Sequence, residues 1–272
     1  MRRLLDAWRR FFYTPGATAP LDQFRRYLAI WTGAWALIHL PHAEELYCRP
    51  ILREGLADVW FGLPAPPLAF VLVLSAGLVA ALVLVITGVR TRASTWAATS
   101  CFAALVVLDA SELLAYNGLA LLQWTIVAVA PDGPSAPRWA TRLAMLQLST
   151  VYGFAALSKL VEGPAWRDGS AITRILGSPR YGQHFASNLL PPMQGAWPVL
   201  LAWSVIVLEL FIALGLWHRR TRMAAALALV GLHVGMMLTM RVSWLFHGLM
   251  LAHLGLFWPL REATSRGTCE AQ

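Results

Sequence analysis

Lys159 has the side chain best suited to acid–base or covalent chemistry in this chain. It is the only lysine among the 272 residues, and arginine supplies the other 21 positive side chains. A lysine amine can lose its proton in an apolar setting and then act as a base or nucleophile, whereas a guanidinium cannot. The alternative is a structural lysine at a helix end, with its charge at the membrane interface. The residue types alone leave both interpretations open.

The segments that must position Lys159 are apolar enough to be membrane spans. Hydrophobic residues make up 58% of the chain and charged residues 13%, whereas a typical soluble domain has about 25% charged residues. The composition predicts one all-α, polytopic membrane helix bundle over residues 1–272. It excludes nucleic-acid binding, because no basic face is separate from the apolar segments. Windows of about 20 apolar residues predict about eight transmembrane helices, at 24–40, 67–89, 95–114, 118–130, 139–160, 197–217, 223–240 and 242–258.

The arginines predict how these spans are oriented. Fifteen of the 21 precede or begin the first span, lie in alternate connections or follow the eighth span, whereas the opposite connections are acidic or mixed. Because cytoplasmic connections are enriched in Lys and Arg, we expect both termini in the cytoplasm. Residues 1–23 then form a basic amphipathic segment on the lipid bilayer, and 260–272 a cytoplasmic tail. The loop 161–196 lies outside, and its part 170–176 predicts a short amphipathic helix in the interface.

Position along the spans predicts a group of polar side chains near the outer surface. At 1.5 Å per residue, Lys159 lies about 31 Å along its helix from Arg138. Asp109 and Asn117 are the predicted polar partners of Lys159, although the sequence gives only a common depth. Asp109 and Glu112 could also be the solvated end of their helix. We expect no metal site, because interfacial histidines are commoner than metal ligands at such positions. The other residues predicted at this depth are His39, His42 and Trp166.

Two further ionisable residues are predicted near the membrane midplane. Glu209 lies about 18 Å from the outer end of its span, and His233 about 16 Å from the inner end of the next. The tight turn near His218 makes these spans antiparallel neighbours. A hydrogen bond between Glu209 and His233 is the simpler interpretation. A proton relay or a contact to a ligand head group is the alternative.

The stretch 150–169, TVYGFAALSKLVEGPAWRDG, resembles the HTTM (horizontally transferred transmembrane) superfamily, which includes the membrane domain of vitamin K-dependent gamma-carboxylase. The matching residues are Lys159, Trp166 and Gly169. The segments FRRYLAIWTGAWALI and LYCRPILREG are similar to the opening of the superfamily. Glu209 and His233 occupy positions where the superfamily pattern has an acidic residue and a histidine.

The resemblance implies a membrane enzyme in which Lys159 is the catalytic base of a carboxylase-like or lyase-like reaction. It implies the bacterial inner membrane and an outward-facing pocket for a quinone-like lipid or a peptide. Two features differ from the carboxylase: Gly118 replaces a histidine, and the printed sequence has no counterpart of the large lumenal portion. We therefore expect a substrate other than a docked protein. With the positions along the spans, the predicted substrate-binding residues are Asp109, Asn117, Trp166, Glu209 and His233.

Two other functions remain open at this point. Some small bacterial members of the superfamily act in the maturation of secreted peptides, so a non-catalytic maturation or partner factor for an exported peptide is the main alternative. A small-solute transporter is disfavoured, because the sequence has neither an inverted repeat nor a pair of interrupted helices.

Overall fold

The computed structural model describes residues 2–16, 18–48, 62, 64–108, 116–131, 137–161, 163–182 and 195–257. This part of the chain is helical and contains no strand, which confirms the all-α prediction for the described residues. The helices are α1 (Arg2–Tyr13), α2 (Ala19–His39), η1 (Leu40–His42), η2 (Glu44–Cys48), α4 (Leu68–Thr87), α5 (Thr91–Leu108), α6 (Tyr116–Val129), α7 (Trp139–Val161), α8 (Pro164–Arg167), α9 (Ser170–Gly177), α11 (Trp197–Gly215), α12 (Arg222–Thr239), α13 (Trp244–Ala252) and η5 (His253–Leu256).

Proline and glycine set several helix boundaries. α2 and α11 each have a proline in the first turn, where the missing N–H costs no helical hydrogen bond. α4 ends at Thr87, and the next residue, Gly88, adopts the left-handed conformation with φ of 76°. The Val89 N–H then donates to the Leu84 carbonyl at 2.9 Å, so the chain reverses into α5.

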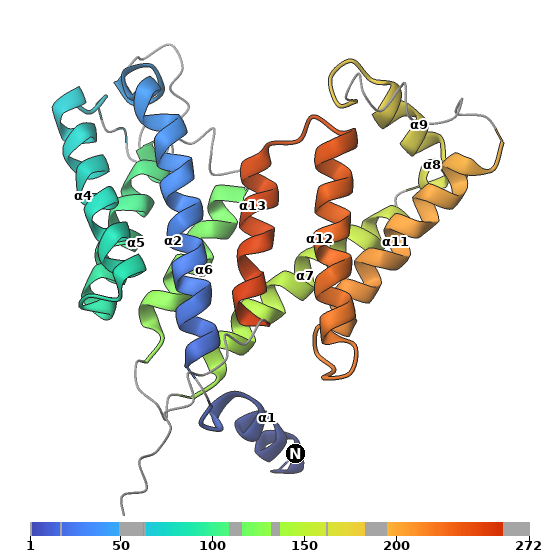
Figure 1. The fold of residues 1–272 in the computed structure, drawn as a ribbon, viewed down its shortest axis with the longest axis horizontal. Coiled ribbons are helices and arrows are strands. Elements are labelled where there is room, and N and C mark those ends of the chain that lie inside the picture. The colour runs from blue at the N-terminus through green and yellow to red at the C-terminus, as the bar shows by residue number, and fades with distance from the viewer. Residues whose placement is uncertain are drawn as a thin grey trace, which may run out of the picture.

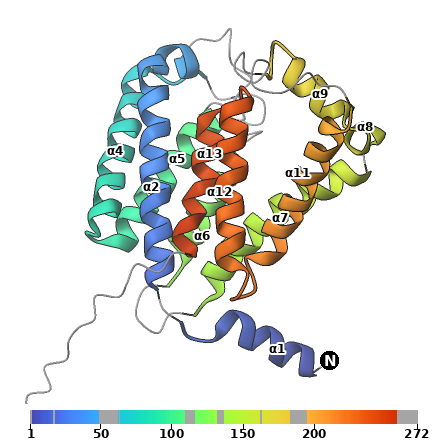
Figure 2. The same ribbon diagram turned by 45° about the vertical axis from the view of Figure 1, so that its right-hand side comes forward.

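The helices form an upright group and an oblique pair (Figures 1 and 2). α2, α4, α5, α12 and α13 run roughly alongside one another, whereas α7 and α11 cross them at a slant. α7 and α11 approach closely, since a β-carbon added at Gly153 would lie 3.9 Å from the β-carbon of Ala213. This oblique pair carries Lys159 and Glu209, and α8 and α9 cover its end.

Aromatic side chains fill the interior between the upright helices. Trp35 and Trp124 are 1% and 0% exposed. The Trp124 indole N–H donates to Thr32 Oγ1 at 2.9 Å, which joins α6 to α2. The Trp31 indole N–H donates to the Leu245 carbonyl at 2.6 Å, which joins α2 to α13.

Apolar side chains also cover much of the outer surface. Leu37, Val73 and Leu214 are each at least 70% exposed. Four of the described helices, α4, α7, α11 and α12, are long and apolar enough to cross a membrane. α6 and the α13–η5 segment are shorter apolar helices. These features fit an integral membrane protein, whose outer surface is in contact with lipid.

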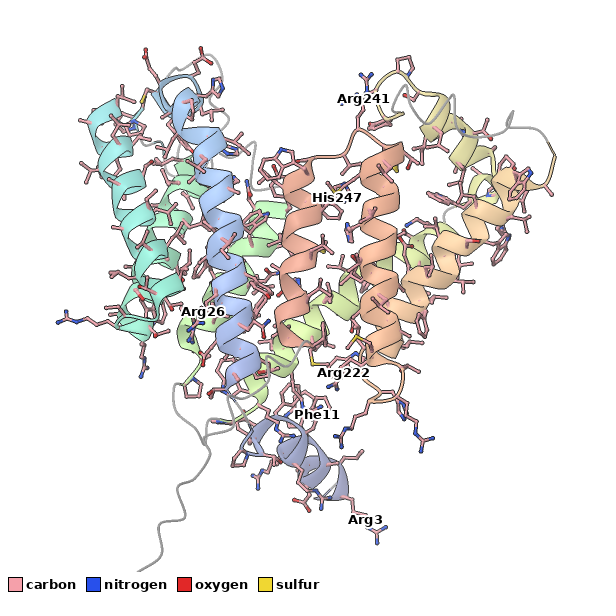
Figure 3. All side chains as sticks on the ribbon, viewed as in Figure 1. Arg3, Phe11, Arg26, Arg222, Arg241 and His247 are labelled. Carbon is pink, nitrogen blue, oxygen red and sulfur yellow. The ribbon has the colours of Figure 1, made fainter. Side chains whose placement is uncertain are left out.

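The N-terminal helix α1 lies across one end of the bundle. Phe11 lies on the side of α1 that faces the bundle, and Arg3 extends away from it (Figure 3). The guanidinium carbon of Arg142 on α7 lies 3.8 Å from the centre of the Phe11 ring. Phe11 also contacts the Trp217 ring, with 5.8 Å between the ring centres. α1 therefore packs on the bundle through its aromatic side.

Candidate functional site

The predicted catalytic residue, Lys159, forms an ion pair with Glu209. Lys159 Nζ lies 2.7 Å from Glu209 Oε1 and 2.9 Å from Oε2. It also donates to the Ala155 carbonyl, one turn earlier on α7, at 3.1 Å. The side chain of Lys159 thus points back along its own helix, the direction in which helical side chains lean. This places the ammonium group between α7 and α11.

Both partners of this ion pair are largely removed from solvent. The side chain of Lys159 is 15% exposed and that of Glu209 is 9% exposed. Opposite charges in such a position are stable only while they stay paired. Each charge of the pair therefore compensates the other, and neither is isolated in the interior.

Trp166 forms an apolar wall beside the ammonium group. Lys159 Nζ lies 5.1 Å from the centre of a Trp166 ring, within the range of a cation–π interaction. Trp166 belongs to the short helix α8, which begins at Pro164. The structure thus brings together the predicted residues Lys159, Trp166 and Glu209.

The turn after Trp166 requires glycine at position 169. Gly169 has φ of 79°, a conformation that L side chains rarely adopt. A β-carbon there would lie 2.5 Å from the Pro198 carbonyl carbon and from the Val199 nitrogen, both in α11. Asp168 Oδ1 accepts a hydrogen bond from the Ser170 N–H at 2.9 Å, and this bond lowers the pKa of the exposed Asp168. The Trp-x-x-Gly pattern therefore seats α8 and α9 against α11.

A second polar chain crosses the bundle below the ion pair. The Tyr152 hydroxyl on α7 is hydrogen-bonded to His233 Nε2 on α12. His233 Nδ1 lies 2.8 Å from His247 Nδ1, and Figure 3 shows His247 on α13 beside α12. All three side chains are buried. If the Tyr152 hydroxyl donates, His233 donates in turn to His247, and reversing both bonds moves a proton along the chain.

The predicted hydrogen bond between Glu209 and His233 is wrong. Glu209 bonds to Lys159, and His233 bonds to Tyr152 and His247. The prediction treated both helices as perpendicular to the membrane, whereas α11 is oblique to α12 (Figure 1). Depth along a helix therefore did not identify the partner of Glu209.

Other predicted site residues lie elsewhere or outside the described part. Asn117 is buried at the start of α6, and no hydrogen bond joins it to Lys159. The His39 ring stacks on Trp35, with 4.3 Å between the ring centres. The exposed His42 lies 3.6 Å from Glu45. Asp109 and Glu112 lie outside the described residues.

The sequence did not predict the hydrogen bonds of His233 to Tyr152 and to His247. Tyr152 lies seven residues before Lys159, and therefore on the same side of α7 two turns earlier. This spacing is the only sequence signal for the residue. Among the described residues, no three His, Cys, Asp or Glu side chains come together as a metal site.

Comparison of the chain with protein-family models, curated proteins and solved structures finds no match.

Proposed function

We propose that this chain is an HTTM-type integral membrane protein of the bacterial inner membrane with eight spans. The eight predicted spans correspond in order to α2, α4, α5, α6, α7, α11, α12 and the α13–η5 segment. Fifteen of the 21 arginines lie at the ends of the bundle and in alternate connections, which supports cytoplasmic termini and an outer location for α8 and α9. The superfamily resemblance around Lys159 supports the same arrangement.

We further propose a membrane enzyme in which Lys159 is the base. The observation that carries this proposal is the position of Lys159 Nζ, which Glu209 fixes beside the Trp166 ring. Glu209 favours the protonated amine, so Lys159 must pass on its proton before it can act as a base. The substrate is a quinone-like lipid or a peptide, which loses a proton to the neutral amine in an outward-facing pocket beside Trp166. The chain from Tyr152 to His247 is a candidate route for protons.

The second candidate is a non-catalytic membrane maturation or partner factor for an exported peptide. The observation that favours it is that all three N–H donors of the Lys159 ammonium group have acceptors within the protein. An ammonium group has three N–H donors, and Lys159 has acceptors at both oxygens of Glu209 and at the Ala155 carbonyl. In this case Lys159 serves to hold α7 against α11.

Replacing Lys159 by arginine separates the two functions. Arginine keeps the positive charge and pairs with a carboxylate through two nitrogens, but it cannot become a neutral base. If Lys159 is the base, Lys159→Arg should lower activity about 10²- to 10⁴-fold. The readout is complementation of the deletion phenotype, normalised to the amount of protein in the membrane.

Arg174→Lys is the matched control, because Arg174 is exposed on the nearby helix α9. It exchanges the same two residue types on the proposed outer side and should complement fully. Full complementation by Lys159→Arg at normal protein level would contradict the enzyme. It would leave the maturation factor as the proposed function.

A further inference from the structure

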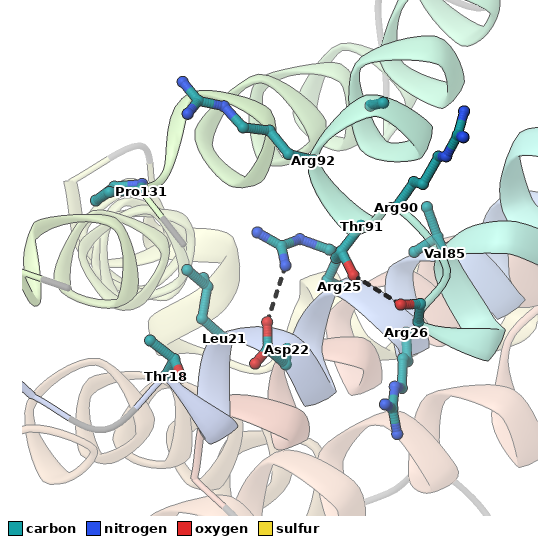
Figure 4. A pocket seen from close by; sticks show the side chains of 12 residues that line it. Thr18, Leu21, Asp22, Arg25, Arg26, Val85, Arg90, Thr91, Arg92 and Pro131 are labelled. Atoms are coloured by element: carbon teal, nitrogen blue, oxygen red, sulfur yellow. Dashed lines mark hydrogen bonds and ion pairs between the residues drawn. The ribbon is translucent and has the colours of Figure 1, made fainter. Parts of the chain in front are cut away.

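A cavity of about 590 Å³ lies where α2 begins and α4 turns into α5, and Lys159 is not among its lining residues. Residues from the first turns of α2, from the α4–α5 turn and from Pro131 after α6 line it (Figure 4). By the arginine rule this is the cytoplasmic end of the bundle. The cavity is therefore distinct from the proposed outward-facing site.

The lining of this cavity has an excess of positive charge. It contains four arginines and one aspartate, which gives a net formal charge of +3. The aspartate, Asp22, accepts a hydrogen bond from Arg25 at 2.8 Å. Arg25 is only 2% exposed and also donates to the Val127 carbonyl at 3.1 Å. These two hydrogen bonds hold its side chain in place at the edge of the cavity. Three more arginines, Arg26, Arg90 and Arg92, are exposed at the same cavity.

The backbone at the α4–α5 turn adds to this preference for anions. Arg90 has φ of 45°, an unusual conformation for a residue other than glycine. It brings the start of α5 to the cavity, where Thr91 and Ala93 contribute to the lining. The first N–H groups of an α-helix have no acceptor within the helix and favour a negative charge. Arg26 reaches the same turn, since its Nη2 would lie 3.6 Å from a β-carbon at Gly88.

The surroundings of the cavity favour a lipid over a free anion. Three apolar side chains near the cavity are exposed. Val83 and Ile86, in the last turns of α4, are 53% and 39% exposed, and Val89, in the α4–α5 turn, is 49% exposed. Phospholipids place a charged phosphate beside acyl chains, and basic pockets between spans at the cytoplasmic side suit anionic head groups. We propose that this cavity binds the phosphate head group of an anionic phospholipid, with its acyl chains along α4.

The test measures how added lipid raises the melting temperature of the detergent-purified full chain. The probes are phosphatidylglycerol, phosphatidylcholine, and inorganic phosphate or pyrophosphate. Phosphatidylglycerol should raise the melting temperature in a saturable manner, because a ligand that binds only the folded protein stabilises it. Phosphatidylcholine and the inorganic anions should have much less effect at the same concentration.

Two variants remove the site by different means. Arg26→Gln/Arg92→Gln removes two exposed charges and should weaken the apparent affinity for phosphatidylglycerol about 25-fold, or about fivefold for each arginine. Ala93→Trp fills the cavity without a change of charge and should also abolish the lipid effect. Arg219→Gln/Arg220→Gln is the matched control, because both residues are exposed at the α11–α12 turn. It should change the affinity less than twofold.

Three results would overturn the proposal. If both double variants weaken the affinity for phosphatidylglycerol equally, the lipid is attracted only by the net charge of the protein. Equal stabilisation by phosphatidylcholine would show that the phosphoglycerol charge is not recognised. Stabilisation by inorganic phosphate that matches phosphatidylglycerol would assign the site to a free phosphate anion. The melting temperature of each variant without lipid shows that it is folded.

Discussion

Replacing Glu209 by leucine leaves the ammonium group of Lys159 partly buried without a carboxylate. Removal of one partner from a buried ion pair costs about 3–5 kcal/mol. The side chains are 15% and 9% exposed, so we expect the lower end, about 3 kcal/mol, for Glu209→Leu and for Lys159→Met. The double variant replaces the pair by apolar groups and should cost about 1 kcal/mol, because neither charge remains unpaired.

The assay is thermal unfolding of the purified protein in lipid nanodiscs, followed by tryptophan fluorescence. At about 2–4 °C for each kcal/mol, each single variant should melt about 6–12 °C lower and the double variant about 2–4 °C lower. Glu209→Leu combined with His233→Phe is the control. Its loss of unfolding free energy should equal the sum of the two single losses within about 0.5 kcal/mol. A double variant of Lys159 and Glu209 whose loss equals the sum of the single losses would refute the ion pair.

Two further predictions concern the second polar chain and the turn after Trp166. Tyr152→Phe should lower the melting temperature by about 2–6 °C, because buried His233 loses a hydrogen-bond partner; an unchanged value would contradict this bond. Gly169→Ala should cost at least about 3 kcal/mol by the same melting assay, since its β-carbon would overlap the backbone at Pro198. Gly177→Ala is the control: a β-carbon there has no atom within 4 Å, so equal losses would disprove the close approach.

The positions of the helices follow largely from the sequence. The predicted span 67–89 corresponds to α4, Leu68–Thr87, because its apolar run ends at the Gly88 turn. α2 and α5 coincide with predicted spans but are not among the four helices that are apolar enough by themselves. The first turns of α2 contain Asp22 and two arginines, and α5 is rich in threonine and serine. Composition thus located these helices, but it does not fix the number of spans.

The partners within the site did not follow from the sequence. Glu209 was expected beside His233, whereas Asp109, a predicted partner of Lys159, lies outside the described residues. Sequence periodicity gives the side of a helix and the distance along it, but not the tilt between two helices. The slant of α7 and α11 brings Glu209 to Lys159 and leaves His233 for Tyr152, whose role was not predicted.

The central claim is that Lys159 presents a reactive amine toward the outer side of the membrane. A membrane-impermeant acylating reagent tests it in right-side-out vesicles, with the product located by mass spectrometry. Because Lys159 is the only lysine, any acylated lysine must be this residue, and Lys159→Arg supplies the background. We predict acylation of Lys159 from the outer side, and faster acylation in Glu209→Leu, where the ion pair no longer restrains the amine. Acylation in inside-out vesicles alone would contradict the proposed orientation and the outward-facing site.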